Sequence, residues 1–218
     1  MKSQFFEKFN HDAEADFYDE DVKNESDPIR AGYPQMLSWI ANKSNLSCAK
    51  RVLDLGAGTG NLSLLLDGYE ELVCVDISAK MLEISENKLS SLEKIKFINE
   101  DLLGYFDISG NPFDSIVSSY AIHHLTEAEK LLLFRKLYHS LNPGGIAILG
   151  DLMFENQTAA AALLENFLSK GNENLIENIK DEFFWDIEGS VFELEKIGFE
   201  TEIQRFSELS WAIFLTQK

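Results

Sequence analysis

The feature that most constrains the fold is a regular alternation of short apolar runs with amphipathic stretches across the middle of the chain. Most of the apolar runs are nearly continuous in Val, Ile and Leu, as is typical of parallel strands covered on both faces. Alternating strands and helices of this kind predict an open parallel sheet with helices on both sides. The predicted strands are residues 51–55, 72–76, 95–98, 115–118 and 146–149.

The stretches between these runs carry the start and stop signals of helices. Ser78 is placed to cap a helix that continues to about Leu89. Residues 126–129 form a capping box, and the helix after it is predicted to end at the Asn-Pro-Gly-Gly of residues 142–145. The helix after the first strand is predicted to be short, because its apolar residues run directly into Asp67 and Gly68.

The two ends of the chain differ from this middle part. A helix is predicted at about residues 29–42, and residues 154–198 are mostly helical in pattern, with Gly171 and Gly189 as breaks. Residues 200–206 and 209–215 are predicted to pair as an antiparallel hairpin, because only two residues separate them. We therefore expect a single domain over residues 1–218, with N-terminal cap helices in residues 1–45 and a helical cap insertion in residues 154–189.

Composition and charge restrict the partners. The 218 residues include 19 basic and 37 acidic ones, which gives a formal net charge of −18. A protein that follows a phosphate backbone needs clustered Lys and Arg, so we expect neither nucleic acid nor a membrane as a partner. No apolar run approaches the ~20 residues of a bilayer span, and no signal peptide is visible. Two cysteines are too few for a disulfide scaffold, so we expect a cytoplasmic protein, either a monomer or a homodimer.

The most specific local motif is the glycine-rich segment Asp54-Leu-Gly-Ala-Gly-Thr-Gly60, directly after the first predicted strand. Glycines there permit a tight turn and let a ligand approach the backbone. Asp76 ends the second strand, where a carboxylate can bind both hydroxyls of a ribose. Asp101 and Leu102 follow the third strand, where they can meet the amino edge and one face of an adenine. The three strand ends together predict a nucleoside site.

Two residues argue against a dinucleotide as that ligand. The dinucleotide fingerprint has its third glycine where this chain has Asn61. Asp54 places a carboxylate near the position of a pyrophosphate, and like charges repel there. A ligand that carries an ammonium group suits Asp54 better. A nicotinamide-dependent oxidoreductase would use Asp76 in the same way and stays as an alternative.

The glycine-rich segment, Asp76, Asp101 and residues 113–126 resemble the class I S-adenosylmethionine-dependent methyltransferases. Residues 118–130, Ser-Ser-Tyr-Ala-Ile-His-His-Leu-Thr-Glu-Ala-Glu-Lys, are especially similar to a group of small, largely uncharacterised bacterial enzymes of that class. The resemblance covers nearly the whole chain. It implies an α/β, Rossmann-like three-layer sandwich with a helical cap, whose seven-stranded mixed sheet has the order 3-2-1-4-5-7-6 with strand 7 antiparallel.

The resemblance also implies the activity and the cofactor. It implies methyl transfer from S-adenosyl-L-methionine to a small-molecule acceptor, with S-adenosyl-L-homocysteine as the product. A non-catalytic S-adenosylmethionine-binding module stays as a second alternative, because class I methyl transfer has no obligatory catalytic side chain.

The resemblance assigns the cofactor contacts residue by residue. The methionine portion would lie on the glycine-rich turn, with Asp54 near its ammonium group and the backbone around Ser118 close by. Asp76 would bind the ribose, and Ile77 and Leu102 would pack on the two faces of adenine. Tyr18 would close over the cofactor, unless it only anchors the N-terminal segment in the core. The full set of predicted cofactor-binding residues is Asp54, Gly56, Ala57, Gly58, Asp76, Ile77, Asp101, Leu102, Ser118 and Tyr18.

The acceptor side is less defined. His123, Tyr18, Tyr120 and Trp185 are the candidates there, and His123 is the candidate general base for an acceptor that must lose a proton. The segments around Tyr18 and after residue 154 are acidic, so we expect a neutral or cationic acceptor. No metal is expected, because the cysteines are isolated and the adjacent His123 and His124 should face different ways.

Overall fold

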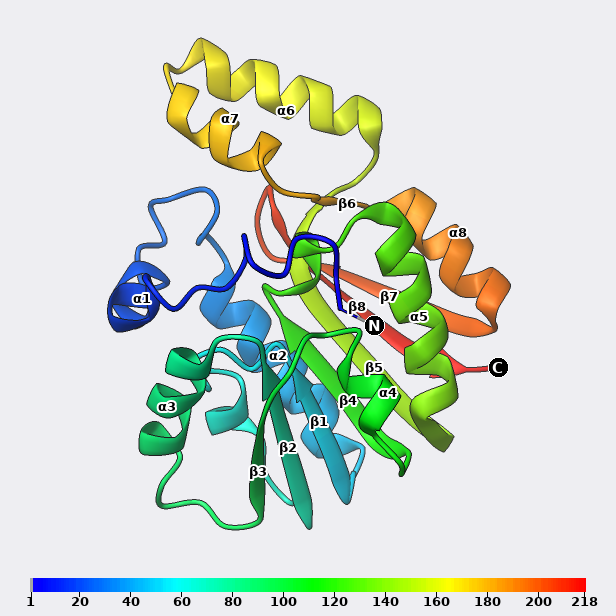
Figure 1. The fold of residues 1–218 in the computed structure, drawn as a ribbon. Coiled ribbons are helices and arrows are strands. Elements are labelled where there is room, and N and C mark those ends of the chain that lie inside the picture. The colour runs from blue at the N-terminus through cyan, green and yellow to red at the C-terminus, as the bar shows by residue number, and fades with distance from the viewer. Residues whose placement is uncertain (1) are drawn as a thin grey trace.

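Helices cover both faces of one sheet in the computed structural model, which describes residues 2–218 (Figure 1). The strands follow the order β3-β2-β1-β4-β5-β8-β7, and β6 pairs with β5 off this path. The strands are β1 (Arg51–Leu55), β2 (Glu71–Asp76), β3 (Ile95–Asn99), β4 (Phe113–Ser119), β5 (Leu141–Phe154), β6 (Trp185–Asp186), β7 (Phe199–Arg205) and β8 (Ser210–Gln217).

The topology confirms the predicted sheet. Strands β1 to β5 are parallel, and β8 pairs antiparallel with both β5 and β7. With β7 and β8 counted as the sixth and seventh strands, the order is the expected 3-2-1-4-5-7-6. The two-residue β6 is an addition that the sequence pattern did not predict, because so short a strand has no apolar run of its own.

The helices lie between and beyond these strands. They are α1 (Ala15–Asp21), α2 (Tyr33–Leu46), α3 (Ala79–Lys88), α4 (Tyr105–Ile108), α5 (Glu127–Ser140), α6 (Gln157–Ser169), α7 (Glu173–Lys180) and α8 (Ile187–Ile197), with short 3-10 turns η1 (Ser63–Leu65) and η2 (Ile122–His124). None of the helices within residues 2–218 has the length and apolar character that crossing a bilayer requires.

The predicted helix signals are confirmed except at two places. The hydroxyl of Ser78 accepts from the backbone N–H of Met81 at 3.0 Å, and the capping box opens α5. Helix α2 begins later than predicted because Gly32 has a φ of 81°, outside the helical region. Gly171 separates α6 from α7 as expected, but Gly189 is not a break. It lies in the first turn of α8, where its N–H donates to the capping carboxylate of Asp186.

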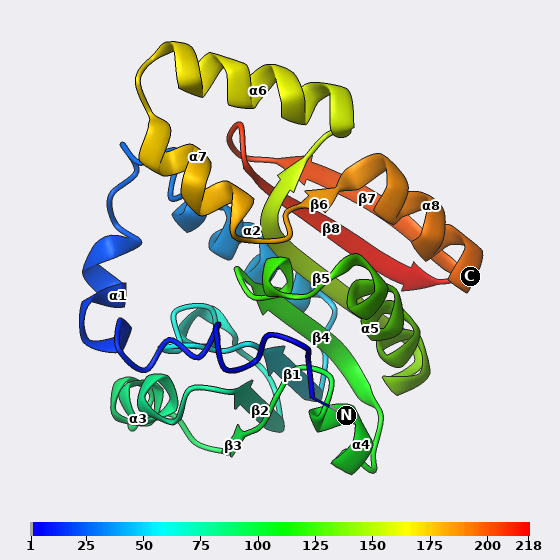
Figure 2. The ribbon, with the colours of Figure 1, turned by 45° about the horizontal axis from the view of Figure 1, so that its top comes forward.

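Two apolar layers hold the sheet between the helices. On one face, α2 contributes Met36 and Ile40, both fully buried. On the other face, α5 contributes Leu133 and Phe134. Helices α6 and α7 lie side by side, and their buried residues Phe167, Ile176 and Ile179 extend the layer of α2. The N-terminal segment crosses in front of the sheet (Figures 1 and 2). The core thus supports the strand ends, and the N-terminal segment and the α6–α7 segment lie beyond these ends.

Candidate active site

A cavity of about 780 Å³ lies where β1 to β4 end. One side of it is formed by the glycine-rich turn after β1, by the residues that follow β2 and β3, and by the segment from Ser119 to Leu125. The other side is formed by the N-terminal segment, by residues around Arg30, and by the segment 178–182 at the end of α7. The cavity therefore joins the edge of the sheet to parts of the chain that are distant in sequence.

The glycine-rich turn requires its glycines for two different reasons. Gly56, Gly58 and Gly60 have φ values of 76°, 52° and 82°, in the left-handed region that favours glycine. A Cβ atom on Gly56 would come within 2.3 Å of the Cβ of Ala121, and one on Gly60 within 2.5 Å of the Oγ of Ser85. At Gly58 the nearest atom would be 3.9 Å away. Gly56 and Gly60 thus allow close packing, while the backbone at Gly58 stays open on its cavity side.

Asp76 ties the end of β2 to this turn. Its Oδ2 accepts the N–H of Gly58 at 2.7 Å, and its Oδ1 accepts that of Ser78 at 2.8 Å. Burial raises the pKa of Asp76 to about 6, against the opposing effect of these hydrogen bonds. Each carboxylate oxygen can accept a further hydrogen bond, so Asp76 can hold the turn and a ligand hydroxyl at once.

Asp54 lies fully buried and does not itself line the cavity. Its Oδ2 accepts from the hydroxyl of Ser63 at 2.5 Å, but its Oδ1 has no hydrogen-bond partner within residues 2–218. Burial raises the pKa of Asp54 to about 7. A buried carboxylate with one unsatisfied oxygen costs free energy. A hydrogen-bond donor or a positive charge next to the Oδ1 of Asp54 would therefore stabilise the site.

Asp101 is occupied by the N-terminal segment. Its Oδ1 accepts the backbone N–H of Ser3 at 3.0 Å, and its Oδ2 accepts the hydroxyl of Ser3 at 2.5 Å. Oδ1 also accepts the N–H of Leu103 at 2.9 Å, and only 2% of Asp101 is exposed. Leu102 and Ile77 line the cavity, while the carboxylate that the resemblance assigns to adenine has Ser3 as its partner.

Two of the remaining predicted residues line the cavity. Burial raises the pKa of Tyr18, and the guanidinium of Arg30 lies 5.8 Å from the centre of its ring. Tyr120 donates its hydroxyl to the carbonyl of Ile29 at 2.8 Å and contacts the hydroxyl of Ser210. The hydroxyl of Tyr120 thus holds the segment before α2 rather than standing free.

Two others lie elsewhere. Ser118 is fully buried, and its hydroxyl donates to the carbonyl of Leu55 at 2.6 Å, so its neighbour Ser119 borders the cavity instead. Trp185 was predicted on the acceptor side, and that prediction is wrong. Its ring is fully buried against Phe134, and its indole N–H donates to Asp151 at 3.2 Å.

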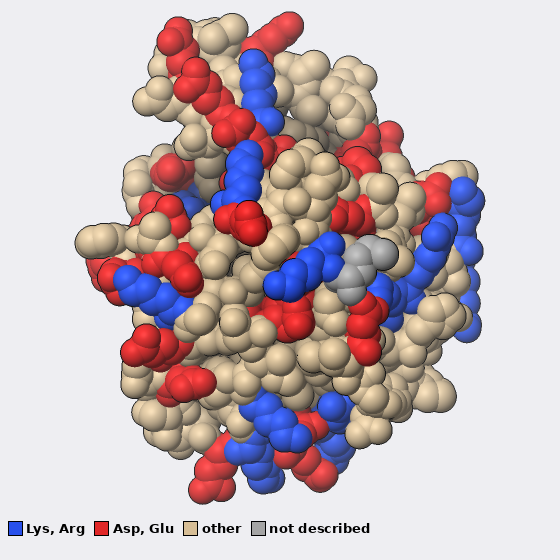
Figure 3. Space-filling model, viewed as in Figure 1, with Lys and Arg blue, Asp and Glu red and all other residues tan. Residues whose placement is uncertain are grey.

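The charges around the cavity are mostly negative. Among the described residues that line it, six are acidic and two, Lys8 and Arg30, are basic; the acidic ones are Glu14, Asp21, Asp76, Asp101, Asp181 and Glu182. Figure 3 shows acidic side chains over α1 and over α6 and α7 as well, with basic ones between them. Acidic side chains therefore outnumber basic ones around the cavity within the described chain.

His123 lies between two carboxylates. Its Nδ1 contacts Asp151, whose Oδ2 also accepts the backbone N–H of His123 at 2.8 Å. Its Nε2 lies 3.2 Å from the Oε2 of Glu182. Burial lowers the pKa of His123, but the two carboxylates outweigh burial and raise it above its ordinary value. Both ring nitrogens therefore have partners.

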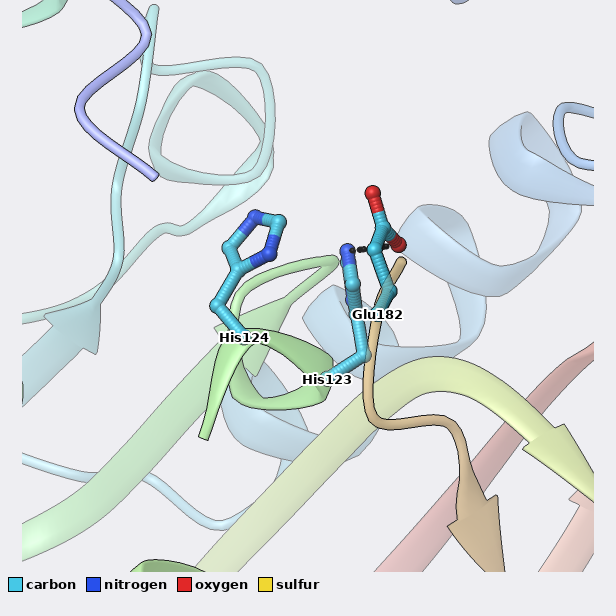
Figure 4. Close-up of side chains that lie close together, drawn as sticks. All are labelled: His123, His124 and Glu182. Atoms are coloured by element: carbon cyan, nitrogen blue, oxygen red, sulfur yellow. Dashed lines mark ion pairs between the residues drawn. The ribbon is translucent and has the colours of Figure 1, made fainter. Parts of the chain in front are cut away.

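His124 faces the same point, contrary to the sequence-based expectation. The ring centres of His123 and His124 are 4.1 Å apart, and one potential ligand atom from each ring and from Glu182 lie within 4.8 Å of one another (Figure 4). The Nε2 of His124 lies 3.1 Å from the Nε2 of His11, while its Nδ1 is buried without a partner in the described chain. Burial lowers the pKa of His124 well below its usual range and so favours the neutral ring.

Three residues of this cluster carried no role in the sequence-based site. Asp151 had a usable signal, because a carboxylate within the apolar run of β5 needs a buried partner. His11 and Glu182 had none. They lie outside the strands and reach His124 and His123 only through the packing of the N-terminal segment and of the segment after α7.

Comparison with known proteins identifies the family. Residues 52–145 match a family described as a methyltransferase domain. The chain is 30% identical over 203 residues to an uncharacterised methyltransferase of Oceanobacillus iheyensis. This match covers 91% of this chain and 92% of that protein.

Solved structures share the fold. A DhpI–SAH complex has a TM-score of 0.67 at 16% identity, covering 95% of this chain and 93% of that one. The N-methyltransferase NodS of Bradyrhizobium japonicum, in complex with S-adenosylhomocysteine, has a TM-score of 0.64 at 14% identity and covers 87% and 88%. With the match to the Oceanobacillus protein over nearly the whole of both chains, the chain belongs to the methyltransferases, in the bacterial group that includes that protein, and it shares the fold of these two S-adenosylhomocysteine-bound proteins.

Proposed function

We propose that this chain transfers the methyl group of S-adenosylmethionine to a small-molecule acceptor bound in the same cavity. The proposal rests on one observation: a single cavity of about 780 Å³ is bordered both by the sheet edge and by the cluster of His123, His124 and Glu182. S-adenosylmethionine supplies an activated methyl group on a sulfonium. The protein then has to align two bound molecules and exclude water, and alignment alone accounts for ~7–11 kcal/mol of a barrier.

The residues of the sheet edge fit this cofactor. The unpartnered Oδ1 of Asp54 lies behind the cavity wall and complements an ammonium group through water. The open backbone at Gly58, with Gly56 and Ala57, borders the methionine portion. Asp76 keeps acceptor capacity for the ribose hydroxyls. The side chains of Ile77 and Leu102 supply the apolar contacts for adenine.

The contact between Asp101 and the adenine amino group requires a rearrangement. Ser3 presents an N–H and an O–H to Asp101, the kind of donors that an amino group presents. Ser3 covers Asp101, of which only 2% is exposed, so adenine reaches this carboxylate only when Ser3 gives up these hydrogen bonds. We include the displacement of Ser3 in the proposal.

The acceptor is proposed to be neutral or cationic. Six acidic residues against two basic ones line the cavity within the described chain, so an anion would meet repulsion on entry. Residues 1–45 and 154–189 are proposed to cap this part of the site, with Tyr18 closing over the ligands. His123 serves as a general base only if Glu182 releases its Nε2, because Asp151 holds the Nδ1.

Calorimetry with S-adenosylhomocysteine and with NAD tests the cofactor. We expect S-adenosylhomocysteine to bind and NAD not to bind. At a hundredfold excess over Kd, binding adds ~2.7 kcal/mol to the free energy of unfolding, a rise in Tm of roughly 5–10 °C for a chain of this size. Binding of NAD alone would overturn the assignment.

A second experiment identifies the acceptor. The purified chain is incubated with isotopically labelled S-adenosylmethionine and fractionated metabolite pools, and labelled products are identified by mass spectrometry. A labelled small molecule supports the proposal. Tight binding of S-adenosylhomocysteine with no labelled product in any pool would favour a non-catalytic binding module.

A further inference from the structure

Three potential metal ligands converge on the cavity wall formed by η2 and the segment after α7. His123, His124 and Glu182 all line the cavity, and one nitrogen or oxygen from each lies within 4.8 Å of the other two. The Nε2 of His123 and the Oε2 of Glu182 are 3.2 Å apart. Two ligands about 2.0–2.1 Å from one zinc ion in tetrahedral geometry are separated by a similar distance. The 3.2 Å separation therefore fits a shared cation as well as an ion pair.

The second nitrogen of His123 is already oriented by a carboxylate. With the proton on Nδ1, His123 donates to Asp151 and presents a lone pair on Nε2 toward Glu182. Asp151 is fixed in turn by the backbone N–H of His123 at 2.8 Å and by the indole of Trp185 at 3.2 Å. A metal-binding imidazole usually has this kind of outer carboxylate, which sets its tautomer and its direction.

His124 is arranged in the same way by His11. When the Nε2 of His124 donates to the Nε2 of His11, 3.1 Å away, the Nδ1 of His124 carries a lone pair. That Nδ1 is buried and has no partner within residues 2–218. Figure 4 shows His124 with a ring nitrogen turned toward His123 and Glu182. Leaving a buried polar atom unsatisfied is costly, and a bound cation would remove that cost.

We propose that His123, His124 and Glu182 bind one divalent ion of the Zn²⁺ class. Two imidazoles and one carboxylate suit Zn²⁺, Co²⁺ or Fe²⁺, whereas Mg²⁺ and Ca²⁺ prefer ligand sets made of oxygen. Asp151 and Glu182 bring two negative charges next to the site, which offset the charge of the ion.

The site has a chemical consequence that rests on the proposed function. A metal ion with three protein ligands keeps a coordination position free, and here the ligands border the acceptor cavity. A hydroxyl or thiol of the acceptor binds at that position, and the ion lowers the pKa of that group. That group then loses its proton to water, its oxygen or sulfur bonds to the methyl group, and the bond from the methyl carbon to the sulfonium breaks to leave S-adenosylhomocysteine. His123 cannot accept that proton while both its nitrogens have partners.

The test is a metal titration of the full chain after treatment with a chelator. Zn²⁺ binding is measured by calorimetry and Co²⁺ binding by visible absorption, and we expect one ion per chain with cobalt bands typical of nitrogen and oxygen ligands. Loss of an outer partner usually costs about 10–100-fold in metal affinity, so His11→Ala should show a loss in that range. Glu182→Gln and His124→Ala, which remove ligands, should lose at least as much.

His139 provides the matched control. It is the remaining histidine of the chain and is exposed on α5, so His139→Ala should bind metal as the wild type does. Glu182 is only partly buried, so Glu182→Gln keeps the test valid should His124→Ala fail to fold. Substoichiometric binding by the wild type, or equal affinity of the wild type and Glu182→Gln, overturns the proposal.

Binding of S-adenosylhomocysteine separates this proposal from the proposed function. The wild type and His139→Ala are also titrated with S-adenosylhomocysteine, and both should bind it with the same affinity. Metal binding without S-adenosylhomocysteine binding would overturn the function and keep the metal site. S-adenosylhomocysteine binding without metal binding would overturn the metal site and keep the proposed function.

Discussion

The cavity has two walls that are built differently. The sheet-edge wall consists of the turns after β1, β2 and β3, which the ladder of parallel strands holds next to one another. The cluster wall consists of side chains from three separate segments, represented by His11, His123 and Glu182. Backbone hydrogen bonds between strands fix the first wall. Side-chain contacts and one backbone hydrogen bond, from the N–H of Phe183 to the carbonyl of His123 at 2.9 Å, fix the second. Under the proposed function, we expect a change in the cluster wall to alter acceptor binding without disturbing cofactor binding.

The two walls also differ in how their charges are satisfied. In the sheet-edge wall, burial raises the pKa of Asp54 to about 7 and that of Asp76 to about 6. Both carboxylates thus gain from a donor or a positive charge brought by a ligand. In the cluster wall, His123 already lies between Asp151 and Glu182, and the unsatisfied atom is the Nδ1 of His124. We expect the two walls to respond differently to substitution.

The largest expected effect is a loss of stability in Trp185→Ala, a substitution in the core next to the cluster wall. Trp185 is fully buried, so its truncation leaves a cavity and removes a donor from Asp151. The free energy of unfolding should fall by roughly 3–5 kcal/mol, measured by urea denaturation. Trp39→Ala on α2 is the control, because Trp39 is only partly buried. A loss no larger than that of the control would contradict the core position of Trp185.

The second effect concerns pH and the sheet-edge wall. The pKa of Asp54 is higher in the folded chain, at about 7, than its ordinary value of 3.8. Between about pH 7 and pH 3.8, Asp54 is therefore protonated in the folded state but not in the unfolded state. The free energy of unfolding rises as the pH falls through this range. Asp54→Asn should abolish that contribution and raise the free energy of unfolding at pH 8 by up to roughly 4 kcal/mol. It should also weaken the binding of S-adenosylhomocysteine.

Denaturation of both proteins from pH 8 to pH 5 checks this prediction. The difference between wild type and Asp54→Asn isolates Asp54 from other titrating groups. A difference that does not change with pH would show that Asp54 is not protonated in the folded chain over this range.

A third effect separates the walls by ligand binding. Asp76→Ala removes the acceptor of the Gly58 and Ser78 N–H groups and the proposed partner of the ribose. A hydrogen bond to a charged group contributes about 1.5–3 kcal/mol, so the affinity for S-adenosylhomocysteine should fall at least tenfold by calorimetry. Glu83→Ala, at an exposed acid on α3, should leave the affinity unchanged. Equal affinities for both variants would make Asp76 a turn residue only.

The two walls explain why the sequence predicted one part of the site better than the other. Asp76 and Leu102 each follow an apolar run, so the parallel topology alone brings them to one edge. Nothing near Glu182 indicates a site, because its place beside His123 depends on how the segment after α7 packs. The error at Gly189 has a similar origin. A local pattern marks glycine as a break, but the capping carboxylate of Asp186 makes it part of a helix.

The smallest expected effect is a change in the affinity of Ser3→Ala for S-adenosylhomocysteine, and its direction shows whether the N-terminal segment contacts the cofactor. Ser3 donates its hydroxyl to Asp101, the residue proposed to meet the adenine amino group. If Ser3 has to leave, Ser3→Ala removes a competitor, and one hydrogen bond of about 0.5–1.5 kcal/mol corresponds to a roughly two- to tenfold gain in affinity for S-adenosylhomocysteine. Ser90→Ala, at an exposed serine after α3, should show no gain. A loss of affinity in Ser3→Ala would mean instead that Ser3 contacts the ligand and that the N-terminal segment is part of the cofactor site. Because the same segment carries His11, that result would also couple cofactor binding to the cluster wall.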